Sequence, residues 1–109
     1  MNKTKYQINS DNIKSNSEET SAISSISYEI ENANNNDLNN ASIQTQIEIL
    51  KSQNSFPKNL SYLKSYTDPK TGTTTSAFLN KDTGKVTLGM TGTNVHKDAI
   101  LKQTFGVPS

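Results

Sequence analysis

Two stretches in the N-terminal half of the chain repeat apolar residues at helical spacing. In the first, residues 18–32, serines and glutamates separate three isoleucines at i, i+3 and i+7: Ile23, Ile26 and Ile30. The second covers residues 38–52 and has a similar stripe: Ile43, Ile47 and Leu50. Such stripes are typical of amphipathic helices. Because the asparagines 34–36 between them favour a turn, the two stretches predict a short helical hairpin.

Residues around these helices suggest where they begin and end. Ser17 stands just before the first stretch, and we expect its hydroxyl to cap that helix. Pro57 closes the helical region, because the preceding Phe56 is disfavoured in the α conformation. Residues 1–17 show no sustained period and predict a flexible arm. The isoleucine stripe of the first helix is expected to be core; the alternative is a face that docks a partner.

From residue 60 onward the pattern changes to that of strands. Runs rich in Tyr, Leu, Thr and Val cover three segments: residues 60–67, 73–80 and 85–91. Turn-forming residues separate them at 68–72 and 81–84. In the third run one side carries Val86, Leu88 and Met90, and the other carries Lys85, Thr87 and Gly89. The segment predicts a three-stranded antiparallel meander.

The last segment predicts one more element. Leu101 and Phe105 lie one helical turn apart, and Gly106 is a suitable stop, so we expect a short C-terminal helix over residues 97–104. The whole chain is then of the α+β class, with a helical hairpin, a meander and a terminal helix.

Composition narrows the classes of function. Residues 1–50 carry three Lys against seven acids, whereas residues 51–109 carry eight Lys against three acids, so the halves have opposite charge. This split predicts either attraction between the halves or a join of segments of different origin. Without any Arg, and with no dense basic cluster, the chain is not expected to bind nucleic acid.

Other absences limit cofactors and location. There is no Cys, which excludes disulfides and thiolate zinc sites. A lone histidine, His96, provides no second imidazole for a metal, so we expect neither a metal nor a cofactor. No run is long and apolar enough for a signal peptide or a bilayer span. The expected location is the cytoplasm, or outside the cell by export without a cleaved signal peptide.

A family resemblance rests on residues 67–100, TDPKTGTTTSAFLNKDTGKVTLGMTGTNVHKDAI. The segment resembles the hairpin and following strand at the start of bacterial lipase-class-3-like α/β-hydrolases. It is also similar to the N-terminal part of staphylococcal lipase effectors secreted by the type VII system. The resemblance implies a carboxylic ester hydrolase ancestry and a lipid or acyl-ester substrate. It also implies that residues 18–109 are an incomplete N-terminal portion of a lipase-like domain.

The resemblance also implies a site at the end of the third strand. Thr93 matches the residue that helps to form the family's oxyanion hole, with Gly92 and Asn94 in support. A glycine there lets the loop turn a hydroxyl and backbone N–H groups toward a developing negative charge. The family usually has Arg where this chain has Thr91. Without the family, the same residues are an ordinary turn at a strand end.

The catalytic set is incomplete. No G-x-S-x-G elbow occurs, and His96 comes too early in the chain to match the triad histidine. We expect His96 to be solvated rather than a base or metal ligand, and Asp98 to lie in the first turn of the last helix rather than to pair with it.

Three hypotheses follow from this incomplete set. In the first, the chain is a truncated lipase-like protein that is inactive alone. The second is a small interaction module that binds a protein partner, such as one of a secretion system, through its helical hairpin. In the third, the chain complements a separately encoded hydrolase half.

Overall fold

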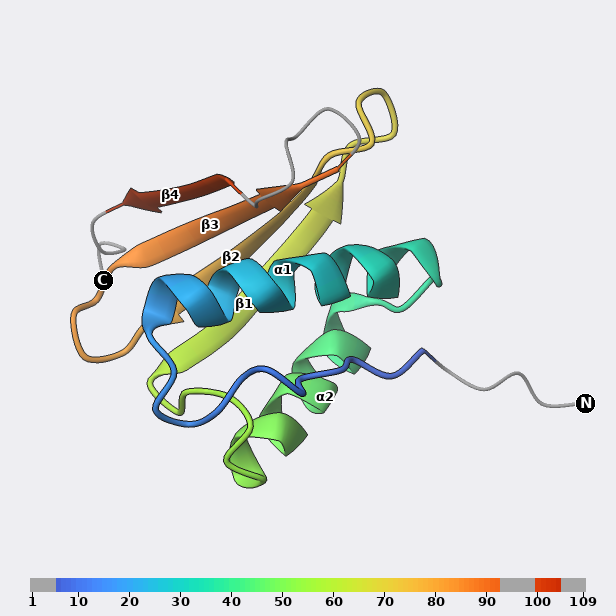
Figure 1. Ribbon diagram of the computed structural model, residues 1–109. Coiled ribbons are helices and arrows are strands. Elements are labelled where there is room, and N and C mark those ends of the chain that lie inside the picture. The colour runs from blue at the N-terminus through green and yellow to red at the C-terminus, as the bar shows by residue number, and fades with distance from the viewer. Residues whose placement is uncertain (1–5, 93–99, 105–109) are drawn as a thin grey trace, which may run out of the picture.

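A computed structural model describes residues 6–92 and 100–104 of the chain. The elements follow one another in this order: α1 (Glu19–Asn35), α2 (Asn40–Ser52), β1 (Leu60–Thr67), β2 (Thr74–Asn80), β3 (Val86–Thr91) and β4 (Ile100–Thr104). The strands form one antiparallel sheet in the order β1-β2-β3-β4, and both helices lie on the same face of it (Figure 1). The α+β class, the two helices and the three-stranded meander are as predicted.

The element after the meander is a strand, so the prediction of a C-terminal helix is wrong. β4 pairs with β3, and Met90 lies opposite Ile100 in the register. An unpaired β3 would present a row of free backbone N–H and C=O groups, which pairing with a fourth strand satisfies. A helix of only about two turns offers little stability against that gain.

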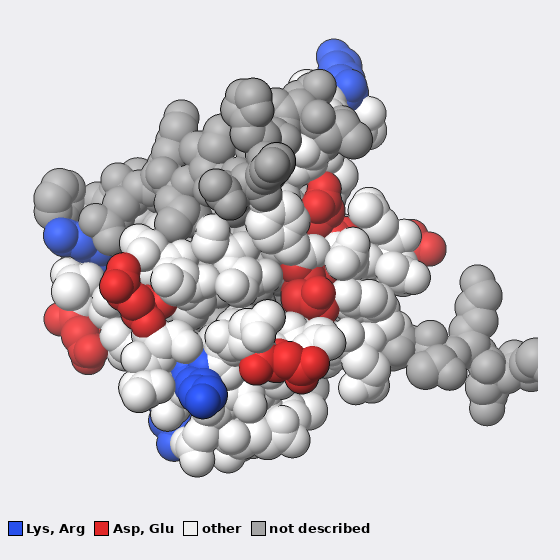
Figure 2. Space-filling model, in the orientation of Figure 1, with Lys and Arg blue, Asp and Glu red and all other residues white. Residues whose placement is uncertain are grey.

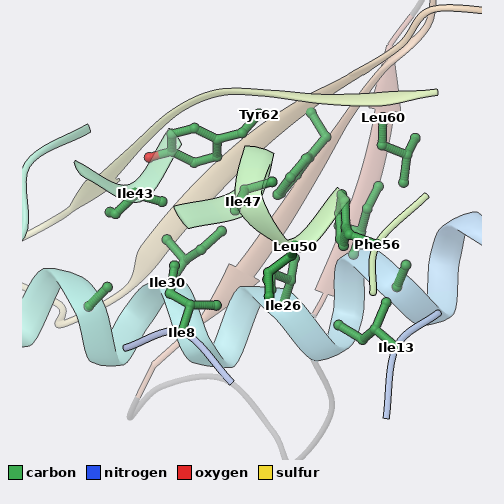
Figure 3. Close-up of a cluster of buried hydrophobic side chains, with 14 of the residues drawn as sticks. Ile8, Ile13, Ile26, Ile30, Ile43, Ile47, Leu50, Phe56, Leu60 and Tyr62 are labelled. Carbon is green, nitrogen blue, oxygen red and sulfur yellow. The ribbon is translucent and has the colours of Figure 1, made fainter. Parts of the chain in front are cut away.

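Residues 6–17, which we call the strap, pack against the helices, so the prediction of a flexible arm is wrong for them. Residues 1–5 of the predicted arm lie outside the described residues. Ile8 and Ile13 are buried in the core (Figure 3). The side-chain amide of Gln46 accepts from the Ile8 N–H at 2.7 Å and donates to the Tyr6 carbonyl at 2.8 Å. Two buried isoleucines and the two hydrogen bonds of Gln46, which we call the Gln46 clamp, therefore help to hold a segment that has no helical or strand periodicity of its own.

The core lies between the helical layer and the sheet. The predicted isoleucine stripe of α1 is fully buried, as is Ile47 of α2, and so the stripe is core (Figure 3). Phe78 joins the core aromatics, with its ring centre 5.7 Å from that of Tyr62 in an edge-on arrangement. Since each helix packs chiefly on the sheet, α1 on β2 and β3 and α2 on β1, the two do not form a hairpin that stands by itself.

The start of α1 differs from the prediction. Its N-cap is Glu18, which makes no side-chain cap hydrogen bond, whereas the Ser17 hydroxyl accepts from the Lys14 N–H at 2.8 Å. Ser17 thus closes a turn of the strap rather than capping the helix. By contrast, Asn39 caps α2 by accepting from the Ser42 N–H at 2.8 Å.

The two faces of the sheet differ in composition. The inner face, which the helices cover, carries Gly89 and five buried polar residues of β2 and β3: Thr74, Ser76, Asn80, Thr87 and Thr91. The outer face carries five partly exposed aliphatic residues of the same strands: Ala77, Leu79, Val86, Leu88 and Met90. The predicted alternation of β3 is thus confirmed, and it is the Thr and Gly side that packs under α1.

Charge follows the two layers. Residues 6–52 carry seven acids and two lysines, a net charge of −5, and residues 58–92 carry five lysines and two acids, a net charge of +3. The helical side in Figure 2 accordingly shows several acidic side chains and few lysines. The opposite charges of the two halves have become an acidic helical layer on a basic sheet layer.

Candidate functional site

The candidate site begins where β3 ends. β3 lies inside the sheet between β2 and β4, and its inner-face residues Thr87 and Thr91 are buried. Gly92 follows at once, with a φ of +148°, a backbone conformation that L side chains rarely adopt. A fixed strand thus passes into a turn that requires glycine.

A neighbouring turn packs against Gly92. A Cβ at this position would lie 2.6 Å from the Gly72 carbonyl oxygen and 2.9 Å from the Thr73 Cα. That turn is itself fixed, because the Asp68 carbonyl accepts from the Gly72 N–H at 2.7 Å and the Asp68 carboxylate accepts from the Lys70 N–H at 2.8 Å. Both the conformation and the close approach therefore exclude a side chain at residue 92.

Several predicted site residues lie outside the described residues. These are Thr93, Asn94, His96 and Asp98. Of the predicted site, the structure thus shows the strand that leads to it and the glycine that opens it. Thr91, which stands where the resemblance leads one to expect Arg, is fully buried on the inner face.

Hydroxyl groups gather on the inner face near this end of β3. Thr67 and Thr74 bond to each other through their hydroxyls at 2.7 Å. Within the described part of the chain, the buried hydroxyls of Ser76 and Thr91 have no hydrogen-bond partner. Neither has a base beside it among the hydrogen bonds of the described residues, so neither is prepared to act as a nucleophile. Among those residues there is also no cluster of His, Cys, Asp or Glu that could hold a metal ion.

A second polar cluster, which the sequence did not predict, lies at the bulge of β1 between Tyr62 and Lys64. The Tyr62 hydroxyl is 2.6 Å from Asn40 Oδ1 and 2.8 Å from Ser65 Oγ, and Asn34 Nδ2 donates to Ser65 Oγ at 2.9 Å. Burial raises the pKa of the Tyr62 phenol, and the hydrogen bond with Ser65 opposes this in part. The cluster ties the end of α1 and the start of α2 to the sheet, which is a structural role.

A third polar contact joins the start of α1 to the β2–β3 hairpin. The Glu19 carboxylate accepts from Asn80 Nδ2 at 2.7 Å and from the Thr87 hydroxyl at 3.0 Å. Asn80 also accepts from the Asp82 N–H at 2.8 Å within the turn. More than 60 residues separate Glu19 from its partners, so no local pattern indicates this contact.

Neither α1 nor α2, the two helices in the described ranges, has the length and hydropathy to cross a bilayer. The chain matches no family model, no curated protein and no solved structure.

Proposed function

We propose that this chain is a lipase-like module of ester-hydrolase ancestry that contributes an oxyanion-binding loop, and that it turns over no ester by itself. The observation that carries the proposal is the passage from the buried strand β3 into Gly92, whose positive φ turns the chain against the Gly72 turn. The loop donors would be the backbone N–H groups after Gly92 and the Thr93 hydroxyl.

Physical chemistry supports this role for a strand end. Oxyanion stabilisation needs donors that are already oriented before charge develops, because reorienting them would cost part of the gain. β3 is held on both sides by paired strands and on its inner face by α1, so the residues leaving it start from a fixed position. A Thr hydroxyl and amide N–H groups are suitable donors for the tetrahedral intermediate of a lipid or acyl ester.

The proposed lack of turnover is supported by the sequence, which holds no G-x-S-x-G elbow and one histidine only. The purified chain should not hydrolyse p-nitrophenyl acyl esters above the background rate. Hydrolysis that disappears in Thr93→Val, but persists in the control Thr20→Val on the exposed side of α1, would contradict the proposal.

Loop binding can be tested directly without a nucleophile. A long-chain alkyl phosphonate monoester resembles the tetrahedral intermediate and should shift the amide NMR signals of Gly92 and Thr93. Gly92→Ala should abolish these shifts, because its Cβ would meet the Gly72 carbonyl. Millimolar phosphonate that leaves both amides unmoved in the parent chain would remove the oxyanion role.

A second candidate function is a protein-interaction module, and the outer face of the sheet favours it. The helical version of this hypothesis is wrong for the apolar stripe of α1, since Ile23, Ile26 and Ile30 have no exposed area. The aliphatic outer face, by contrast, is partly exposed. If the chain is such a module, it binds through the sheet.

A further inference from the structure

The outer face has a regular arrangement that the strand register defines. Three rows cross β1, β2 and β3: Ser61, Leu79 and Val86; Lys64, Ala77 and Leu88; Tyr66, Thr75 and Met90. In these rows the residues of β2 and β3 are aliphatic except for Thr75. The β1 residue of each row is polar or aromatic. Tyr66 is 65% exposed, so the aromatic edge of the face is open to solvent.

In β3 the distribution of polarity between the two faces is the reverse of the usual one. An antiparallel sheet with one covered face normally turns its apolar residues toward the cover and its polar residues toward water. Here β3 turns Thr87 and Thr91 toward α1, and it turns Leu88 and Met90 outward. The outer face therefore has the composition of a surface that is itself covered.

Charge on the outer face has a single sign. None of the nine residues in the three rows is acidic, and Lys64 is exposed in the middle row. Residues 58–92, which include β1, β2 and β3, carry a net charge of +3. A cover that brought more positive charge would be repelled, and an acidic one would be attracted.

The inner face of the same sheet is already covered by an acidic layer. On the inner face lie the two helices, which together with the strap (residues 6–52) carry a net charge of −5. Most of their isoleucines are buried, and none of their glutamates is. We infer that the outer face docks an amphipathic helix with an apolar stripe and acidic flanks, supplied by another polypeptide. This inference rests on the second candidate function and names the chemistry of its partner.

Two other occupants fit less well. A second copy of this chain, packed sheet to sheet, would bring together two basic sheet layers, with Lys64 on both. A bilayer is bound by apolar side chains that reach about 5–10 Å below the headgroups. The five aliphatic residues are instead only partly exposed.

Met90 makes the inference testable with few signals. The chain has two methionines, Met1 and Met90, so ¹³C-methyl methionine labelling yields one reporter on the outer face and one reference in the terminal segment. The probe is a synthetic 18-residue peptide with a leucine stripe and glutamate flanks. A peptide with lysines in place of the glutamates is its control.

The expected result is a saturable shift of the Met90 methyl by the acidic peptide, without a shift of Met1. Lys64→Glu should weaken the acidic peptide about threefold or more. Leu88→Glu should abolish the Met90 shift, while Ile49→Ser, which alters an exposed apolar residue of α2, should not. Circular dichroism of each variant confirms that the fold is intact.

The contrary results separate the two proposals. If both peptides bind equally well, the face docks helices but its partner is not acidic, and the inference fails while the module survives. A Met90 shift caused by phosphatidylglycerol vesicles alone, or by raising the protein concentration alone, assigns the face to a membrane or to a second copy and overturns the inference. No Met90 shift with any probe overturns both.

Discussion

Replacing Gly89 by alanine tests how closely α1 approaches the sheet. A Cβ at residue 89 would overlap the Ser27 hydroxyl oxygen and would lie 3.3 Å from Ile23 Cγ2. Unstrained carbon contacts are about 3.5–4.0 Å, so α1 must move away or Ser27 must leave its place. Ser27 is held there because its hydroxyl donates to the Ile23 carbonyl at 2.6 Å.

The magnitude follows from two opposing effects. Overpacking a core by one methyl group costs about 1–3 kcal/mol. Alanine restricts the unfolded chain more than glycine does, which returns about 0.4–1 kcal/mol. We therefore expect Gly89→Ala to lower the free energy of unfolding by about 1–2 kcal/mol, measured by urea titration with circular dichroism.

The double variant with Ser27→Ala gives the decisive comparison. Ser27→Ala alone should change stability by less than about 1 kcal/mol, because a lost hydrogen bond is offset by the better helix propensity of alanine. In the double variant the new methyl takes the space of the hydroxyl, so the cost of Gly89→Ala should shrink by about 1 kcal/mol. A Gly89→Ala protein as stable as the parent, or a double variant with additive losses, would refute the close packing of α1 on β3.

Three further predictions concern polar contacts. Burial raises the Tyr62 pKa above its ordinary value of about 10, so the folded state holds this proton more tightly than the unfolded chain does. The free energy of unfolding should therefore fall as the pH rises above about 10. Tyr62→Phe should flatten that fall in urea titrations, and an unchanged slope would contradict the prediction. Glu19→Ala should lower the free energy of unfolding by about 1.5–3 kcal/mol, because it removes the hydrogen bonds to Asn80 and Thr87, and Glu18→Ala should lower it much less. Equal losses of stability for the two variants in thermal melts would show that the contact with the hairpin is unimportant. Gln46→Ala should speed amide exchange of Ile8 at least tenfold, whereas the exposed Gln44→Ala should not, and equal exchange in both variants would exclude the clamp.

Part of the candidate site could be predicted from the sequence. Gly92 was expected to open the loop after the third strand, and its positive φ is the conformation for which glycine is favoured. Its packing against Gly72 could not be foreseen, because that contact depends on how two turns meet at one end of the sheet. The polar cluster around Tyr62 escaped prediction for the same reason: its members are drawn from α1, α2 and β1.

The sequence by itself determined the local elements. Helical spacing of isoleucines determined α1 and α2, and alternation with turn residues determined β1, β2 and β3, because these periods follow from the backbone geometry of each element alone. Tertiary structure decided the strand β4, the packed strap and the face of the sheet that α1 covers. Each of these depends on what a segment meets in space: a free strand edge, a glutamine on another helix, or a glycine small enough to admit Ser27. Such contacts join residues far apart in the chain, and no local period records them.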